Sequence, residues 1–194
     1  MLLDKLKNVR VILGSQSPRR KELLAKMGID FMIVVKETDE TYDAQQNPED
    51  IVKHIARNKL MGFHGKEFED ALVIAADTVV VHRGEVLGKP RSVSEAVSVL
   101  QELQGQNHQV LTAVALQYRG LTRCFVEETL VEFSKLTAAE IDYYVEQYPP
   151  LDKAGSYGIQ DWIGIVGVKA VTGSYENVVG LPTARLYQEL KQLV

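Results

Sequence analysis

The sequence has one cysteine, Cys124, and only four histidines. A single cysteine excludes both a disulfide framework and a zinc site built on several cysteines. The histidines, His54, His64, His82 and His108, are not spaced like a metal site or a catalytic triad. No Gly-x-Ser-x-Gly nucleophile elbow and no Walker A loop occur either. The pattern therefore supports neither serine-nucleophile chemistry nor a P-loop nucleotide site.

Long apolar runs are also lacking. No apolar run reaches 18 residues, and the start of the chain, Met1–Lys5, does not open an apolar signal-peptide region. We therefore expect a cytoplasmic protein without a membrane partner. The net charge of −4 argues against a protein that binds nucleic acid through bulk electrostatics. Any cationic cluster in this acidic chain must be local, which favours a binding site.

The composition is that of an ordinary globular protein, with 45% hydrophobic and 25% charged residues. A chain of 194 residues can form one large domain or two small lobes with a real core. Strand-like and helix-like patterns mix throughout, without an internal repeat, a low-complexity segment or a linker. We therefore predict a single α/β domain over residues 1–194, with two lobes around a cleft.

Hydrophobic periodicity and capping signals place the elements. Strands are predicted at residues 9–13, 31–35, 71–76 (ending in Asp77-Thr78 and continuing through 79–81), 109–118, 122–133 and 163–171. Helices are predicted at residues 18–27, 48–62, 94–104 and 138–148, with a last one beginning near 182. The two long strands around Arg119 and Gly120 are expected to be antiparallel.

The segment Gly14–Arg20 (GSQSPRR) joins the first strand to the first helix. Ser17 is a good N-cap, and Pro18 suits the first helical position. Outward-facing N–H groups at the positive end of a helix dipole attract anions. Arg19 and Arg20 oppose that dipole, so a bound phosphate would explain them. An ordinary capped helix with two solvated arginines is the alternative.

Asp77 follows six apolar residues, Ala71–Ala76. We expect it at the mouth of a buried strand, where open α/β sheets bind ligands. The alternative is an aspartate that caps the turn after the strand. Lys59 and Lys89, each taken alone, are explained as well by a solvated surface. The residues by themselves therefore indicate an anion-binding α/β protein with carboxylates nearby.

Several segments carry a more specific pattern, in order along essentially the whole chain. They are Ser15–Leu24 (SQSPRRKELL), Ala56–Lys59 (ARNK), Ala75–Val80 (AADTVV), Gly84–Pro90 (GEVLGKP), Gly105–Thr112 (GQNHQVLT), Asp152–Gln160 (DKAGSYGIQ) and Gly173–Pro182 (GSYENVVGLP). These segments resemble the motifs of the Maf family of nucleoside triphosphate pyrophosphatases. The resemblance implies hydrolysis between the α- and β-phosphates, which releases a monophosphate and pyrophosphate.

The resemblance also implies an elongated α/β fold with a central cleft, shared with the inosine-triphosphate pyrophosphatases. Such proteins are often homodimers and use Mg²⁺ or Mn²⁺. Asp77 matches the family's proton acceptor, and Glu40 matches a carboxylate that we assign, with Asp77, to metal binding. Whether Asp77 takes the proton or holds the metal stays open. The residues expected to bind the substrate are Ser15, Arg19, Arg20, Lys59, Thr78, Lys89 and Gln160.

Three of these positions bear on the base. Arg19, Thr78 and Gln160 are similar to the subgroup that acts on dTTP and UTP, whereas the 7-methyl-GTP subgroup has Trp, Gln and Glu there. An amide suits the neutral donor–acceptor edge of uracil or thymine. Two alternatives remain: a pyrophosphatase with another base preference, modified pyrimidines included, and a non-catalytic regulator of cell division. An intact Asp77, Glu40 and Lys89 argue against the regulator.

Overall fold

The structure is a computed structural model that describes residues 1–194. Its strands are β1 (Arg10–Leu13), β2 (Met32–Ile33), β3 (Ala71–His82), β4 (Glu85–Leu87), β5 (Asn107–Tyr118), β6 (Leu121–Phe133) and β7 (Val168–Thr172). Its α-helices are α1 (Leu2–Leu6), α2 (Pro18–Lys26), α3 (Pro48–Met61), α4 (Val93–Leu103), α5 (Ala138–Gln147), α6 (Trp162–Gly167), α7 (Tyr175–Val179) and α8 (Thr183–Leu193). Two short 3₁₀ helices are η1 (Lys66–Phe68) and η2 (Ala154–Ser156).

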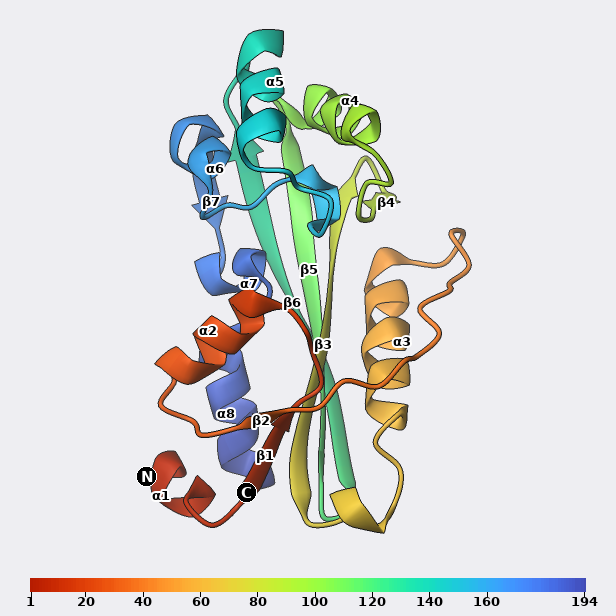
Figure 1. The fold of residues 1–194 in the computed structure, drawn as a ribbon, viewed down its shortest axis with the longest axis vertical. Helices are drawn as coiled ribbons and strands as arrows, with labels where there is room; N and C mark the ends of the chain where they lie inside the picture. Colours follow the sequence, from red (N-terminus) through yellow and green to blue (C-terminus); the bar gives the residue numbers. More distant parts are fainter. The chain divides into compact units, whose positions relative to one another are not determined.

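The strands form one seven-stranded mixed sheet in the order β2-β1-β3-β5-β6-β7, with β4 paired to β3 (Figure 1). β1 runs parallel to both β2 and β3. β4 is antiparallel to β3, and β7 is antiparallel to β6. None of the helices is both long and apolar enough to cross a membrane. The mixed sheet and its helices confirm the predicted α/β class.

The chain divides into two compact units. Unit 1 comprises Met1–Asp77, Thr112–Glu127 and Gly180–Val194, and unit 2 comprises Thr78–Leu111 and Glu128–Val179. The boundary falls inside β3, between Asp77 and Thr78, and not in a linker.

In unit 1, helices cover both faces of the sheet, with α2 and α8 on one side and α3 on the other (Figure 1). The core on the first side joins residues from α2, α8 and the strands, with Leu13, Leu24, Ile74 and Leu186 fully buried. Burial of such side chains stabilises a fold by about 2 kcal/mol each. α3 packs through an apolar face at helical spacing, and Lys59, in the last turn, projects from that same face.

In unit 2, α4 and α5 pack together over the ends of β5 and β6. Leu100 and Leu103 from α4 and Ile141 and Tyr144 from α5 are all at most 1% exposed. The predicted capping box starts α5, since Thr137 and Glu140 each bond the other's backbone. The helix ends predicted from Ser17, Asn47 and Gly62 are also confirmed.

One predicted strand is wrong in its first half and confirmed in its second. The apolar segment 163–171 forms α6 and then β7, where one strand was expected. Only a glycine fits at position 164, because a Cβ there would collide with the Ile159 carbonyl oxygen. That close approach, inside α6, needs a glycine.

Asp77 also lies elsewhere than predicted. β3 continues without a break from Ala71 to His82, so Asp77 is inside the strand and not at its mouth. The neighbouring β1 ends at Leu13, opposite Ile74, and Asp77 lies three positions further along β3. The turn-capping alternative fails for the same reason, because the turn comes only after His82.

A stability prediction follows from Gly155 in η2. Its φ is +67°, and a Cβ there would lie 2.6 Å from Val80 Cγ2 and 2.9 Å from Val80 Cβ. We expect Gly155→Ala to lower the free energy of unfolding by about 3 kcal/mol, from backbone strain plus the clash. Urea denaturation measures it.

Gly120→Ala is the matched control. Gly120 has a similar φ of +78°, but nothing lies within 4 Å of its Cβ position. This variant should cost about 1 kcal/mol, the backbone term alone. Equal losses for the two variants would show that the Val80 contact does not matter.

Candidate functional site

In unit 1, one lysine holds two carboxylates. Lys59 Nζ lies 2.6 Å from Asp77 Oδ1 and 3.0 Å from Glu40 Oε1. The Lys59 and Asp77 side chains are only 16% and 15% exposed, whereas Glu40 is 51% exposed. Three side chains predicted for the site therefore meet, from α3, β3 and the loop before α3.

Local sequence brings them together. Asn47 caps α3 by accepting from the Glu49 N–H, and Pro48 fills its first position. Lys59 then falls in the last turn, where a cation suits the helix dipole. The predicted buried stretch of β3 places Asp77 opposite α3.

Arg20, another predicted site residue of unit 1, is held by Ser15 and Gly180. Arg20 Nε donates to the Gly180 carbonyl at 2.8 Å, and Arg20 Nη1 donates to Ser15 Oγ at 3.2 Å. Burial lowers the pKa of the Arg20 guanidinium, and the Asp77 and Glu40 charges partly offset this by raising it. Arg20 is thus within electrostatic reach of both carboxylates.

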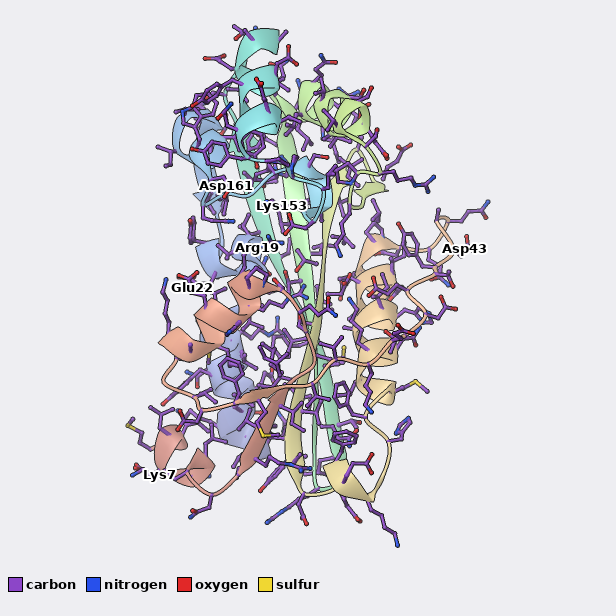
Figure 2. All side chains as sticks on the ribbon, viewed as in Figure 1. Lys7, Arg19, Glu22, Asp43, Lys153 and Asp161 are labelled. Carbon is purple, nitrogen blue, oxygen red and sulfur yellow. The ribbon has the colours of Figure 1, made fainter.

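These contacts explain in part why two arginines lie at the N-terminus of α2, where they oppose the helix dipole. Ser17 caps α2 as predicted, accepting from the Arg20 N–H at 3.4 Å. Protein groups, Ser15 and Gly180, hold the Arg20 side chain, so its placement does not require a phosphate. Arg19 also lies half-buried on the first turn of α2 (Figure 2).

In unit 2, the other predicted residues lie on or beside β3 and η2. Thr78 is half-buried in β3, and Lys89 is exposed in the turn after β4. The Gly155 N–H donates to the Gly88 carbonyl at 3.1 Å, which ties η2 to the residue before Lys89. Unit 2 therefore brings the Lys89 turn next to the segment that leads to Gln160.

Gln160 is exposed on a tightly held turn. The turn is closed by a 3.0 Å hydrogen bond from the Asp161 N–H to the Gly158 carbonyl. Gly158 and Ile159 before it are buried, so Gln160 is the side chain that the turn presents to solvent.

Tyr144 and Asp161, which brace this turn, were not predicted as site residues. The Tyr144 hydroxyl accepts from the Gly158 N–H at 3.0 Å and donates to Asp161 Oδ2 at 3.1 Å. Lys153 Nζ also lies 3.7 Å from Asp161 Oδ2 and 3.0 Å from Asp152 Oδ1 (Figure 2). Burial raises the pKa of the Tyr144 hydroxyl, so it stays a neutral donor. A tyrosine on the apolar face of a helix gives no sequence signal that separates it from core.

His108 anchors the same segment from β5. His108 Nε2 lies 2.7 Å from the Tyr157 hydroxyl, and both side chains are at most 5% exposed. Burial, with a smaller effect of the His82 charge, lowers the pKa of His108 from 6.5 to about 4. The imidazole is therefore neutral at physiological pH.

With this geometry in place, the comparisons with known proteins decide the family. Residues 10–193 match the family model described as Maf-like protein. The chain belongs to the Maf family. The sequence motifs that resembled this family are thereby confirmed.

Two curated Maf relatives are similar over their full length. A Bacteroides fragilis protein named dTTP/UTP pyrophosphatase is 45% identical over 193 residues, which cover 99% of this chain and 100% of that protein. A Porphyromonas gingivalis protein with the same name is 47% identical over 193 residues, covering 98% and 97%. The solved structure of the Staphylococcus aureus Ham1 protein has a TM-score of 0.51 at 14% identity, covering 93% of this chain and 99% of that one. At that identity the likeness shows a shared fold.

Asp77 and Glu40, the two residues predicted to bind a metal, fit a divalent cation only in part. No group of three or more His, Cys, Asp or Glu side chains gathers to hold one. Asp77 Oδ1 and Glu40 Oε1 nevertheless both face the same Lys59 cation. Hard carboxylate oxygens suit Mg²⁺ and Mn²⁺, and Mg²⁺ is commonly held by one or two carboxylates plus substrate phosphates. The pair is therefore compatible with a metal that arrives with a triphosphate.

The buried His108 predicts how stability depends on pH. Unfolded His108 takes a proton below about pH 6.5, whereas the folded residue resists protonation until about pH 4. The free energy of unfolding should therefore fall by about 3 kcal/mol between pH 6.5 and pH 4, and stay constant in this respect above 6.5. Urea denaturation across this range measures the slope.

His108→Gln should remove most of that pH dependence, whatever its effect on stability at pH 7. His64→Gln, at an exposed histidine, should leave the slope unchanged. A slope that survives in His108→Gln would contradict the assignment.

Proposed function

We propose that this chain is a nucleoside triphosphate pyrophosphatase that converts dTTP and UTP to their monophosphates and pyrophosphate. The observation that carries the proposal is the contact of Lys59 with Asp77 and Glu40. The chain belongs to the Maf family, and relatives that are 45% and 47% identical to it are named dTTP/UTP pyrophosphatase. We also expect a cytoplasmic location and a homodimer.

The triphosphate tail needs cations, because it carries several negative charges. We assign this role to Arg20, Lys59 and Lys89, with Ser15 beside Arg20. Arg20 is already oriented by Gly180 and Ser15, so little side-chain freedom is lost when a phosphate binds.

Attack on the α-phosphate needs a water that loses a proton. Asp77 Oδ1 is engaged by Lys59, and Oδ2 is the oxygen that remains to accept this proton. Asp77 and Glu40 would hold Mg²⁺ or Mn²⁺, which would neutralise phosphate charge and lower the pKa of bound water. Lys59 holds the two carboxylates in place whether Asp77 accepts the proton or binds the metal.

Base selection falls to other residues, since every nucleotide shares the triphosphate. We assign it to Arg19, Thr78 and Gln160. The Gln160 amide both donates and accepts hydrogen bonds, as the edge of uracil or thymine does.

Product analysis with an Asp77 variant tests the proposed reaction. Wild-type protein with dTTP and Mg²⁺ or Mn²⁺ should release dTMP and pyrophosphate in equal amounts. Asp77→Asn should turn over about 10²- to 10⁴-fold more slowly, because the base is lost while the shape is kept. Chromatography of the nucleotides and a pyrophosphate assay measure both.

Asp70→Asn is the control, since the Asp70 carboxylate is 92% exposed. It should keep wild-type turnover. Release of dTDP with inorganic phosphate would overturn cleavage between the α- and β-phosphates. Near-normal turnover of a folded Asp77→Asn protein would remove Asp77 from the mechanism.

A second experiment separates base reading from phosphate binding. Gln160→Glu replaces a group that donates and accepts with one that only accepts, so activity on dTTP and UTP should fall selectively. A buried hydrogen-bonding group left unpaired costs about 1–3 kcal/mol, which is about 10- to 100-fold in kcat/KM. Lys89→Ala should depress all triphosphates alike.

The measurement is kcat/KM for dTTP, UTP, CTP and GTP on wild type and both variants. Equal losses across the panel for Gln160→Glu would show that Gln160 does not read the base. A selective loss for Lys89→Ala would place this lysine at the base.

A further inference from the structure

The segment that carries Glu40 has no regular secondary structure of its own. β2 ends at Ile33 and α3 begins at Pro48, and residues 34–47 between them form neither helix nor strand. The Glu40 side chain is 51% exposed, so packing alone does not fix it. Such a segment keeps a carboxylate in one place only where specific contacts offset the conformational entropy that is lost.

Two consecutive residues of α3 hold two consecutive residues of this segment. Asn58 Nδ2 donates to the Asp39 carbonyl oxygen at 3.3 Å. Lys59 Nζ lies 3.0 Å from Glu40 Oε1. Asn58 therefore holds the backbone just before Glu40, and Lys59 holds the carboxylate.

The flanking residues are fixed as well. The Thr41 N–H donates to Asp39 Oδ1 at 2.8 Å, which closes an Asx turn around Glu40. Earlier in the segment, Lys36 passes so close to Gly62, at the end of α3, that a Cβ on this glycine would lie 2.9 Å from Lys36 Cβ. The segment is therefore held on both sides of Glu40.

The Asn58 amide is itself held by a second partner. Asn58 Nδ2 lies 2.9 Å from His54 Nε2, one helical turn earlier. Nδ2 carries two hydrogens, so it can donate to the Asp39 carbonyl and to a ring nitrogen at once. Because Nδ2 only donates, His54 Nε2 is the accepting nitrogen and Nδ1 carries the proton. The amide is thus fixed from both sides.

We propose that Asn58 is a positioning residue that places Glu40 beside Lys59 to bind a divalent cation. The Asp39 carbonyl and the Glu40 nitrogen belong to one planar peptide group, so a bond to that carbonyl fixes the plane from which Glu40 starts. Lys59 alone does not fix this plane, since its ammonium is a point charge on a flexible four-carbon stem. Asn58 therefore acts on the cation only through Glu40. This inference rests on the proposed role of Glu40 in holding the metal.

The affinity of a nucleotide analogue with and without Mn²⁺ tests the proposal without turnover. The probe is α,β-imido-dUTP, in which nitrogen replaces the oxygen between the α- and β-phosphates, and calorimetry measures its Kd. The Mn²⁺ enhancement is the Kd without the cation divided by the Kd with it. Effects on folding or on phosphate binding alone cancel in this ratio.

Asn58→Ala should lower the Mn²⁺ enhancement about tenfold, as the loss of a group that orients a metal ligand does. Alanine is a good helix former, so this variant keeps α3. Asn58→Gln, which keeps the amide, should retain most of the enhancement. Asn8→Ala, at an exposed asparagine between α1 and β1, is the control and should leave it unchanged.

A double variant shows whether Asn58 acts through Glu40. Glu40→Gln should lower the Mn²⁺ enhancement, and adding Asn58→Ala to it should lower the enhancement no further. An unchanged enhancement in Asn58→Ala, or additive losses in the double variant, overturns the role of Asn58.

The proposed function has its own readout. If the wild type forms dTMP and pyrophosphate from dTTP and Glu40→Gln lowers the Mn²⁺ enhancement, a failure of Asn58→Ala leaves the proposed function standing. A wild type without any enhancement, or a Glu40→Gln protein that keeps all of it, overturns the metal role of Glu40 and this inference with it.

Discussion

The contact of Lys59 with Asp77 and Glu40 is the constraint on which unit 1 depends. Two carboxylates that converge in a half-buried position repel each other unless a cation lies between them. Lys59 supplies that cation from the last turn of α3, with Nζ 2.6 Å and 3.0 Å from the two oxygens. The same contact fixes α3 against β3 and orders the chain at Glu40. Placement of the helix and the chemistry proposed for the carboxylates therefore have one physical cause.

The fold was largely predictable from local signals. Caps at Ser17, Asn47 and Thr137 and the apolar stretch after Ala71 each act over a few residues, and the structure keeps all of them. The segment 163–171 was not predictable in this way. Its hydrophobicity suits a strand, and the close approach of Gly164 to the Ile159 carbonyl oxygen, five residues earlier, leaves no periodic signal in the sequence.

For the candidate site, the sequence identified several residue types but not the contacts between them. Asp77 and Lys59 were identifiable as residue types, but their contact spans 18 positions and depends on how α3 meets β3. Tyr144 was missed because its ring is part of the core, and only its hydroxyl, 3.0 Å from the Gly158 N–H, has a polar task. Asp161 was missed because its partners Tyr144 and Lys153 precede it by many residues. Family resemblance supplied the roles of Arg19, Thr78 and Gln160, which no physical pattern in the sequence indicates.

The unbroken course of β3 limits how this chain can change in length. Asp77 and Thr78 are consecutive in one strand, and the residues on either side of them are buried. Side chains alternate between the two faces of a sheet, so one inserted or deleted residue here would turn every later side chain of the strand to the opposite face. Val79–Val81 would then exchange the faces on which they pack. Length variation among descendants of this chain should therefore collect in its loops, while β3 changes by substitution alone.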